Sequence, residues 1–173
     1  NEWLAAHQAE FLAHCERTAV MGVEFPVLQP AYHAFYLLLH MLQHFLRAGF
    51  GLKLLCDWVV FWEKGYGSGV EERFCSMAEE CRVMGFARLV TAVCVKYLGL
   101  SGEKVPLLLC RFDWEAEAAN LEAFLTEILE AEEFGKSSAD RMVALRGTGW
   151  WDYCREFHHQ MPVSYRHLTL PTT

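Results

Sequence analysis

Apolar side chains recur along most of this chain with the spacing of an α-helix. From Trp3 to Ala19 they follow one another three and four positions apart, which is the period of a helix with one buried face. Gly22 and Pro26 should end this first helix. Residues 31–48 are apolar on nearly every side, so we expect them to form the central and most buried helix.

Further helical stretches follow, separated mainly by glycine. We predict helices over residues 52–64, 70–84, 86–98 and 114–133, and two short ones over 137–145 and 151–159. Residues 65–69 contain three glycines and form the clearest loop. Asp113 is placed to cap the helix over 114–133 by accepting backbone N–H bonds. Strand-like alternation occurs only weakly, over 105–110, so the pattern predicts an all-α bundle of about six to seven helices.

Length and composition indicate one domain. The chain has 173 residues, of which 53% are hydrophobic, enough for a sizeable core. We expect residues 1–160 to form a single helical domain. The first residue is not Met, so we expect a fragment, and residues 161–173 lack an amphipathic period and are expected to be a non-native or disordered tail.

The net charge and the cysteines indicate which partners and which cellular setting to expect. The net charge is −7 and no basic run is present, so we expect no direct nucleic-acid binding. The seven cysteines form no Cys-x-x-Cys pair, which favours a reducing, cytoplasmic setting. The most apolar span, residues 34–62, is interrupted by charged residues and histidines. A membrane-spanning helix needs about 20 mostly apolar residues, so we expect a soluble protein without a membrane partner.

The candidate chemistry lies where two predicted helices meet. His33, His40, His44 and Arg47 fall within an arc of roughly 60° on the helix over 31–48. Lys53 and Asp57 are four residues apart on the next helix, close enough to pair across one turn. This polar group is the strongest indication of a functional site in the chain.

Two interpretations of this group remain open. In the structural one, backbone carbonyls or glutamates of a neighbouring helix hold the histidines, and a Lys53–Asp57 salt bridge helps to orient the two helices. In the functional one, the polar stripe lines a cleft, with Arg47 directed at a phosphate or carboxylate.

A metal site at His40 and His44 is a separate alternative. Their spacing allows two imidazoles to share one zinc ion on a helix face. However, Met41 occupies the position of the glutamate that zinc proteases require, and the chain has no adjacent His-Asp pair. We therefore assign no metal ligands, and a metal-dependent hydrolase is kept only as a third function class.

The stretch 36–62 resembles the uncharacterised nucleotidyltransferase family of bacteria, related to the polymerase-β-type nucleotidyltransferases. Its members commonly read His-x-x-x-His-Phe, then Gly-x-Gly-Leu-Arg, then Asp-Trp. The matching positions here are His40, His44, Phe45, Gly49, Gly51, Leu52, Lys53, Asp57 and Trp58. Residues 128–135 resemble a second, looser motif, Ile-Leu-x-x-Gly-Asn-Phe-Gly, so that the resemblance covers about 25–136. Lys53 stands where arginine is usual, which weakens bidentate binding, and Glu132-Glu133 replaces Gly-Asn.

The resemblance implies a substrate-side domain without its own catalytic centre. In such enzymes a preceding α/β domain carries Gly-Ser or Gly-Gly and then Asp-x-Asp carboxylates, which hold Mg²⁺ for nucleotidyl transfer. This chain has no Gly-Ser followed by such a pair. The resemblance thus implies transfer from an NTP to an unknown acceptor by an enzyme whose N-terminal catalytic domain lies outside this chain. Mg²⁺ and the NTP belong to that full enzyme, and we expect no cofactor and no activity in this chain alone.

Within this resemblance, five residues are expected to face the catalytic domain and the substrate. They are His40, His44, Arg47, Lys53 and Asp57. Arg47 and Lys53 would meet the triphosphate or an anionic acceptor, and Asp57 would hold Lys53 in place. The alternative is a non-enzymatic helical binding or regulatory module in which these residues only orient the helices.

Overall fold

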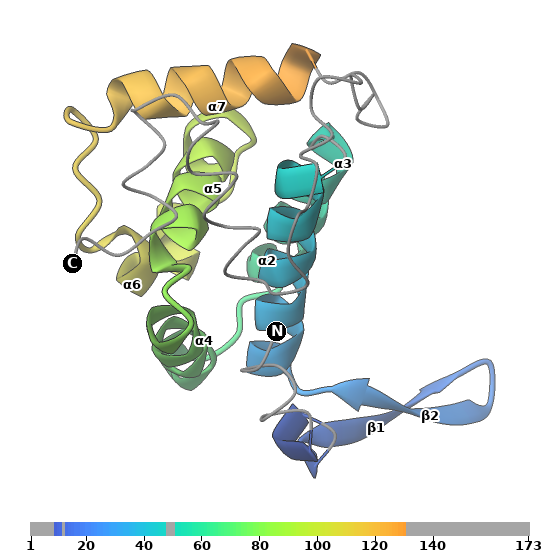
Figure 1. Cartoon of the computed structure of the whole chain (residues 1–173). Coiled ribbons are helices and arrows are strands. Elements are labelled where there is room, and N and C mark those ends of the chain that lie inside the picture. The colour runs from blue at the N-terminus through green and yellow to red at the C-terminus, as the bar shows by residue number, and fades with distance from the viewer. Residues whose placement is uncertain (1–8, 12, 48–50, 131–173) are drawn as a thin grey trace, which may run out of the picture.

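The computed structural model describes residues 9–11, 13–47 and 51–130, and most of these are helical. In chain order the elements are β1 (Cys15–Val20), β2 (Val23–Leu28), α2 (Pro30–Arg47), α3 (Leu52–Glu63), α4 (Ser68–Glu80), α5 (Met84–Tyr97), the 3₁₀ turn η1 (Gly102–Lys104), α6 (Pro106–Leu109) and α7 (Ala118–Glu130). Figure 1 shows the helices gathered into one body, from which β1 and β2 project as an arm. The expectation of a mainly α-helical protein is confirmed.

Helices α2 to α5 lie close to the predicted ranges. Each boundary is within a few residues of the predicted one; the largest shift is the early end of α4 at Glu80. That helix stops because Arg82 takes a left-handed conformation, with φ of 59°, which a continuing helix does not allow. The loop after α3 is also found, although Ser68 and Gly69 belong to the first turn of α4.

The β-hairpin corrects the first predicted helix. Residues up to Ala19 were expected to be helical, but Cys15–Val20 and Val23–Leu28 pair as antiparallel strands. Met21 and Gly22 both have positive φ, 53° and 82°, and form the two-residue turn that suits a hairpin. Valine and phenylalanine recur at every second position of β2, which is a strand pattern. The helical spacing in this region rested on the small residues Cys15 and Ala19.

The weak alternation over residues 105–110 does not give a strand, because Pro106–Leu109 forms the short helix α6. Proline at the first helical position is favourable, since its missing N–H has no partner there in any case. Further along, the carboxylate of Asp113 accepts the N–H groups of Glu115 and Ala116 at 3.1 and 3.0 Å, as expected of a capping residue. The turn that it caps precedes α7, so the regular helix begins later than predicted.

The core is centred on α5, and this differs from the expectation that residues 31–48 would be the most buried helix. Six consecutive residues of α5, from 89 to 94, are fully or almost fully buried. Helices α3, α4, α6 and α7 all pack against α5. Helix α2 packs on α3 and α4 and leaves one side exposed. That exposed side carries the polar stripe.

A cluster of large aromatic rings joins three helices. Phe35 on α2, Trp58 and Trp62 on α3 and Phe74 on α4 are almost fully buried. Their ring centroids lie 5.5–6.4 Å apart, in edge-to-face arrangements that favour aromatic pairs. The indole N–H of Trp58 also donates to the Thr91 hydroxyl at 3.1 Å, which attaches α3 to α5.

Some predictions cannot be compared with the described residues. The helices expected over 137–145 and 151–159, the tail over 161–173 and most of the second family motif lie outside them. Within the described ranges, every helix is too short or too polar to cross a bilayer.

Candidate functional site

The two histidines of the stripe contact each other on α2. The ring centroids of His40 and His44 lie 4.5 Å apart with their planes at 77°. Tyr36, one turn earlier, is stacked parallel to His40, with an interplanar angle of 5° and a centroid distance of 6.2 Å. Because the three residues are spaced by four, their rings form a continuous row along one side of α2. Periodicity placed the histidines on this face, whereas Tyr36 was not recognised as a member of the site.

The ring nitrogens of this row are available to a ligand. Within the described part of the chain, neither His40 nor His44 makes a hydrogen bond, so the backbone carbonyls or glutamates of the structural interpretation are not found there. Burial, and then the nearby His40, lowers the pKa of His44 below its usual value of 6.5. His44 is therefore neutral at pH 7 and can both donate and accept a hydrogen bond.

Lys53 and Asp57 pair within α3, as their spacing predicted. The Lys53 ammonium lies 2.9 Å from the Asp57 carboxylate, and the two side chains are 78% and 44% exposed. His33 near the start of α2 contacts Phe61 near the end of α3, at 5.3 Å between ring centroids. The helices are therefore antiparallel, so the Lys53–Asp57 pair and the two histidines lie towards the same end of the helix pair.

These two pairs remain separate from each other. Among the described residues, no hydrogen bond or ion pair connects the histidines with Lys53 or Asp57. Arg47 closes α2, but its side chain is outside the described part, as is all of Gly49. The structure thus brings four of the five predicted site residues to neighbouring turns without joining them in one network.

Replacing Asp57 by alanine should change stability very little. An exposed pair spaced by four on a helix contributes about 0.3–0.5 kcal/mol, so the free energy of unfolding should fall by no more than this amount. Urea denaturation of the variant and of the matched variant Glu24→Ala, which breaks the exposed Arg17–Glu24 pair, tests this. A loss of about 3–5 kcal/mol would show instead that Asp57 belongs to a buried structural pair.

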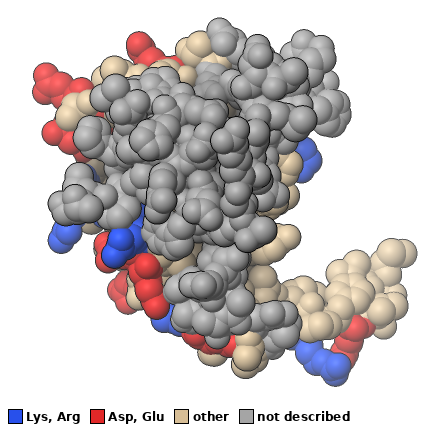
Figure 2. Space-filling model, in the orientation of Figure 1, with Lys and Arg blue, Asp and Glu red and all other residues tan. Residues whose placement is uncertain are grey.

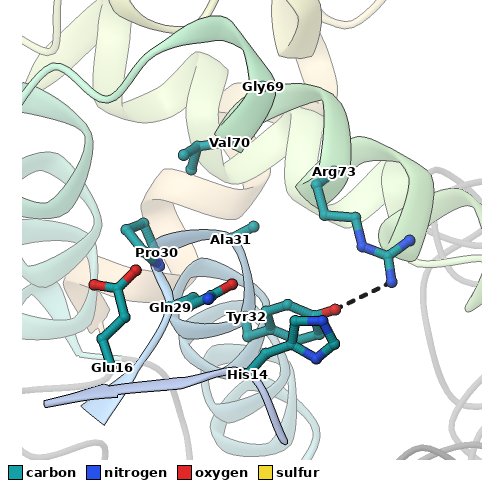
Figure 3. Close-up of a pocket in the computed structure, with 9 residues that line it drawn as sticks. All are labelled: His14, Glu16, Gln29, Pro30, Ala31, Tyr32, Gly69, Val70 and Arg73. Carbon is teal, nitrogen blue, oxygen red and sulfur yellow. Dashed lines mark hydrogen bonds between the residues drawn. The ribbon is translucent and has the colours of Figure 1, made fainter. Parts of the chain in front are cut away.

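A second polar cluster, which the sequence did not reveal, connects the arm to the helices. The Tyr32 hydroxyl donates to the Glu10 carboxylate at 2.9 Å, and Arg73 of α4 donates to both Tyr32 and Glu10. The His14 ring stacks on Tyr32 at 4.9 Å between centroids. Residues of this cluster line a pocket of about 470 Å³ at the base of the arm, shown in Figure 3. Glu10 and Arg73 are 63 residues apart in the chain, so local patterns could not relate them.

One backbone hydrogen bond determines which ring nitrogen of His14 carries the hydrogen. Its Nδ1 lies 2.8 Å from the carbonyl oxygen of Glu10. A carbonyl oxygen only accepts, so Nδ1 must carry the proton, and in the neutral ring Nε2 is left as an acceptor. Arg73 stays charged, since its hydrogen bond to Tyr32 and the Glu10 carboxylate raise its pKa. This cluster holds the base of the arm against α2 and α4.

The described residues show no clustered metal ligands, and two of their free thiols are not activated. They contain no group of three or more His, Cys, Asp or Glu side chains that could hold a metal ion. Burial raises the pKa of Cys75 and Cys81 to about 12, so these free thiols stay protonated at neutral pH.

The described elements thus form a helical domain that carries a projecting β-hairpin and a row of aromatic and imidazole rings. The model of the uncharacterised nucleotidyltransferase family matches residues 2–99, which is more than half of the chain. The chain belongs to this family. No curated protein and no solved structure matches it.

The family match covers the arm and helices α2 to α5. It includes the motif from His40 to Trp58 on which the resemblance was based. It begins before the range of 25–136 suggested by the motifs, and it ends before the second motif at 128–135. The arm is therefore part of the family domain, and only the first motif lies within the match.

Proposed function

We propose that this chain is the helical substrate-side domain of a nucleotidyltransferase and that a separate catalytic α/β domain packs on its arm. Membership of the family supports nucleotidyl transfer as the reaction. In this proposal the carboxylates that hold Mg²⁺ belong to the catalytic domain. In this proposal the chain contributes binding surface for an NTP or for an acceptor.

One observation carries the proposal: an apolar face of the arm is left uncovered. Val20, Val23, Phe25 and Val27 lie on the same face of the hairpin according to its register, and they are 53%, 59%, 38% and 39% exposed. Thr18 and, at the base of the arm, Glu16 lie on this face too, so its outer part is the apolar one. The opposite face carries the Arg17–Glu24 ion pair. Figure 2 shows the arm standing clear of the body with an uncharged end. An exposed apolar face of this kind marks an interaction surface.

The geometry of the arm favours a β-sheet as its partner. A two-stranded hairpin is at best marginally stable in water without a third strand or a covering layer. After the two-residue turn, alternation of the ladder places Pro26 at a position whose nitrogen points away from β1. The outer edge of β2 therefore lacks a donor there, whereas β1 has no proline and can pair with another strand. An α/β domain supplies both a strand edge and an apolar surface.

The polar residues of α2 and α3 take a binding role in this proposal. His40 and His44 have free ring nitrogens, and Lys53 is exposed with Asp57 beside it. They and Arg47 would face the catalytic domain, with Lys53 and Arg47 near the negative charge of the NTP or of an anionic acceptor. The chain itself performs no proton transfer or nucleophilic step in this arrangement.

A reconstitution assay tests the proposal. The purified chain with ATP and Mg²⁺ should transfer no nucleotidyl group, whereas a mixture with the α/β domain of a family member should do so. Phe25→Asp should abolish that gain, because a carboxylate on the apolar face cannot be buried against a sheet without a partner. The matched control Glu24→Asp changes the opposite face and should retain activity.

Two results would contradict the proposal. Nucleotidyl transfer by the purified chain alone would mean that the catalytic groups are within it. A mixture in which Phe25→Asp has no effect would remove the arm as the docking surface. If the α/β domain neither binds nor becomes active, the alternative of a binding or regulatory module is favoured.

A further inference from the structure

Tyr36 differs from the other aromatic residues of α2 in its exposure. Tyr32, Phe35 and Phe45 are buried, whereas 56% of Tyr36 is exposed. The ring of His40 lies parallel to it and offset, at 6.2 Å between ring centroids. Such a pair presents a flat aromatic surface to solvent at the start of the polar row.

The row next to Tyr36 offers hydrogen-bonding groups without a fixed charge. His40 and His44 make no hydrogen bond within the described part of the chain, so their ring nitrogens can bind a ligand. Imidazole nitrogens can hydrogen-bond to the polar edge of a heteroaromatic ring or to a sugar hydroxyl, and a phosphate is bound more strongly by a permanent cation such as Arg or Lys. An aromatic face beside such groups is suited to stacking a nucleobase, because every base has a π-face.

We propose that the exposed ring of Tyr36, which lies parallel to the neighbouring His40 ring, is the stacking platform for a nucleobase. The inference rests on the proposed function, since it concerns the nucleotide which that function requires. It adds Tyr36 as a binding residue. His40 and His44 would contact the base, and cationic side chains would bind the phosphates. The ligand class is a purine or pyrimidine nucleoside, free or phosphorylated.

Isothermal titration of the whole chain with three probes tests the platform. ATP and adenosine should both bind, and inorganic tripolyphosphate should not displace adenosine. Tyr36→Ala should weaken the binding of both nucleosides by on the order of tenfold, the usual effect of removing one stacking ring. Tyr36→Phe keeps the ring and should bind within about twofold of the wild type.

Tyr97 provides a matched control. It is another exposed tyrosine, 40% exposed on α5, and its ring lies 5.1 Å from the Lys96 ammonium. Tyr97→Ala should leave adenosine binding unchanged. In the wild type, adenosine should also shift the carbon-bound ring-proton NMR signals of His40, because a stacked base adds its ring current there. A purely structural role of Tyr36 would not produce that shift.

The outcomes separate this inference from the proposed function. Wild-type affinity in Tyr36→Ala would overturn the platform, and so would binding of tripolyphosphate and ATP with no binding of adenosine. A wild-type chain that binds neither ATP nor adenosine would overturn it as well. None of these results tests the proposed catalytic partner, which the reconstitution assay addresses. Conversely, nucleotidyl transfer by the chain alone would contradict the proposed function but would not contradict stacking of a base on Tyr36.

Discussion

Replacing Phe74 by alanine is expected to lower the free energy of unfolding by about 3–5 kcal/mol. The side chain is fully buried, and its ring contacts Phe35, Trp58 and Trp62 at centroid distances of 6.4, 5.5 and 5.7 Å. Removal of the ring leaves a cavity where α2, α3 and α4 meet, and three large rings cannot collapse into it without moving their helices. Chemical denaturation followed by tryptophan fluorescence measures the loss.

Ser76 supplies the control on the same helix. Its side chain is exposed, so Ser76→Ala should change the free energy of unfolding by less than about 0.5 kcal/mol. A loss below about 1 kcal/mol in Phe74→Ala would contradict a core centred on this aromatic cluster. Because α2 carries the stripe and packs on α4, the cluster also determines how the stripe is presented.

The second large effect is expected at Glu71, the buried carboxylate of the described chain. Glu71 on α4 is only 4% exposed, and its Oε1 accepts the Leu108 N–H at 2.9 Å. The nearby backbone N–H of Leu107 also favours the charged form of this carboxylate. These are orphan donors in the first turn of α6, where the preceding Pro106 has no N–H of its own. Glu71 therefore caps α6 from another helix.

Glu71→Ala should lower the free energy of unfolding by about 1–3 kcal/mol, because it leaves buried N–H groups without an acceptor. Glu71→Gln keeps an acceptor oxygen and should lose less. Urea denaturation of both variants measures the difference. Equal losses in the two variants would mean that the charge of Glu71, rather than its acceptor atoms, stabilises α6.

The pH dependence of the same site has a defined sign. Burial raises the pKa of Glu71 above its usual value, although the backbone hydrogen bonds partly oppose this shift. Between the unfolded and folded pKa values the folded state holds more protons than the unfolded state. The contribution of Glu71 to stability is therefore complete below the unfolded pKa and declines as pH rises through the folded pKa. Stability of the wild type should fall relative to Glu71→Gln across this window, and parallel pH curves for the two proteins would contradict it.

The arm shows where local patterns were insufficient. Up to Ala19 the spacing of apolar residues predicted a helix, because helical and strand periods are hard to tell apart in so short a segment. The decisive features were the Met21-Gly22 turn, with positive φ at both residues, and the alternation of β2. The alternation is visible in the sequence, whereas the positive φ of Met21 is not. Nor is the exposure of the apolar face, because it depends on which other elements cover the hairpin.

The sequence by itself determined the features that act over one or two helical turns. Helices α2 to α5, the Lys53–Asp57 pair and the contact between His40 and His44 all follow from spacings of three or four residues, where neighbours on a helix meet. Only the tertiary structure decided that α5 is the central helix, that Glu71 caps α6 and that Arg73 reaches Glu10. These features join residues 37 and 63 positions apart, or depend on how four helices pack around a fifth, and no local period encodes such contacts.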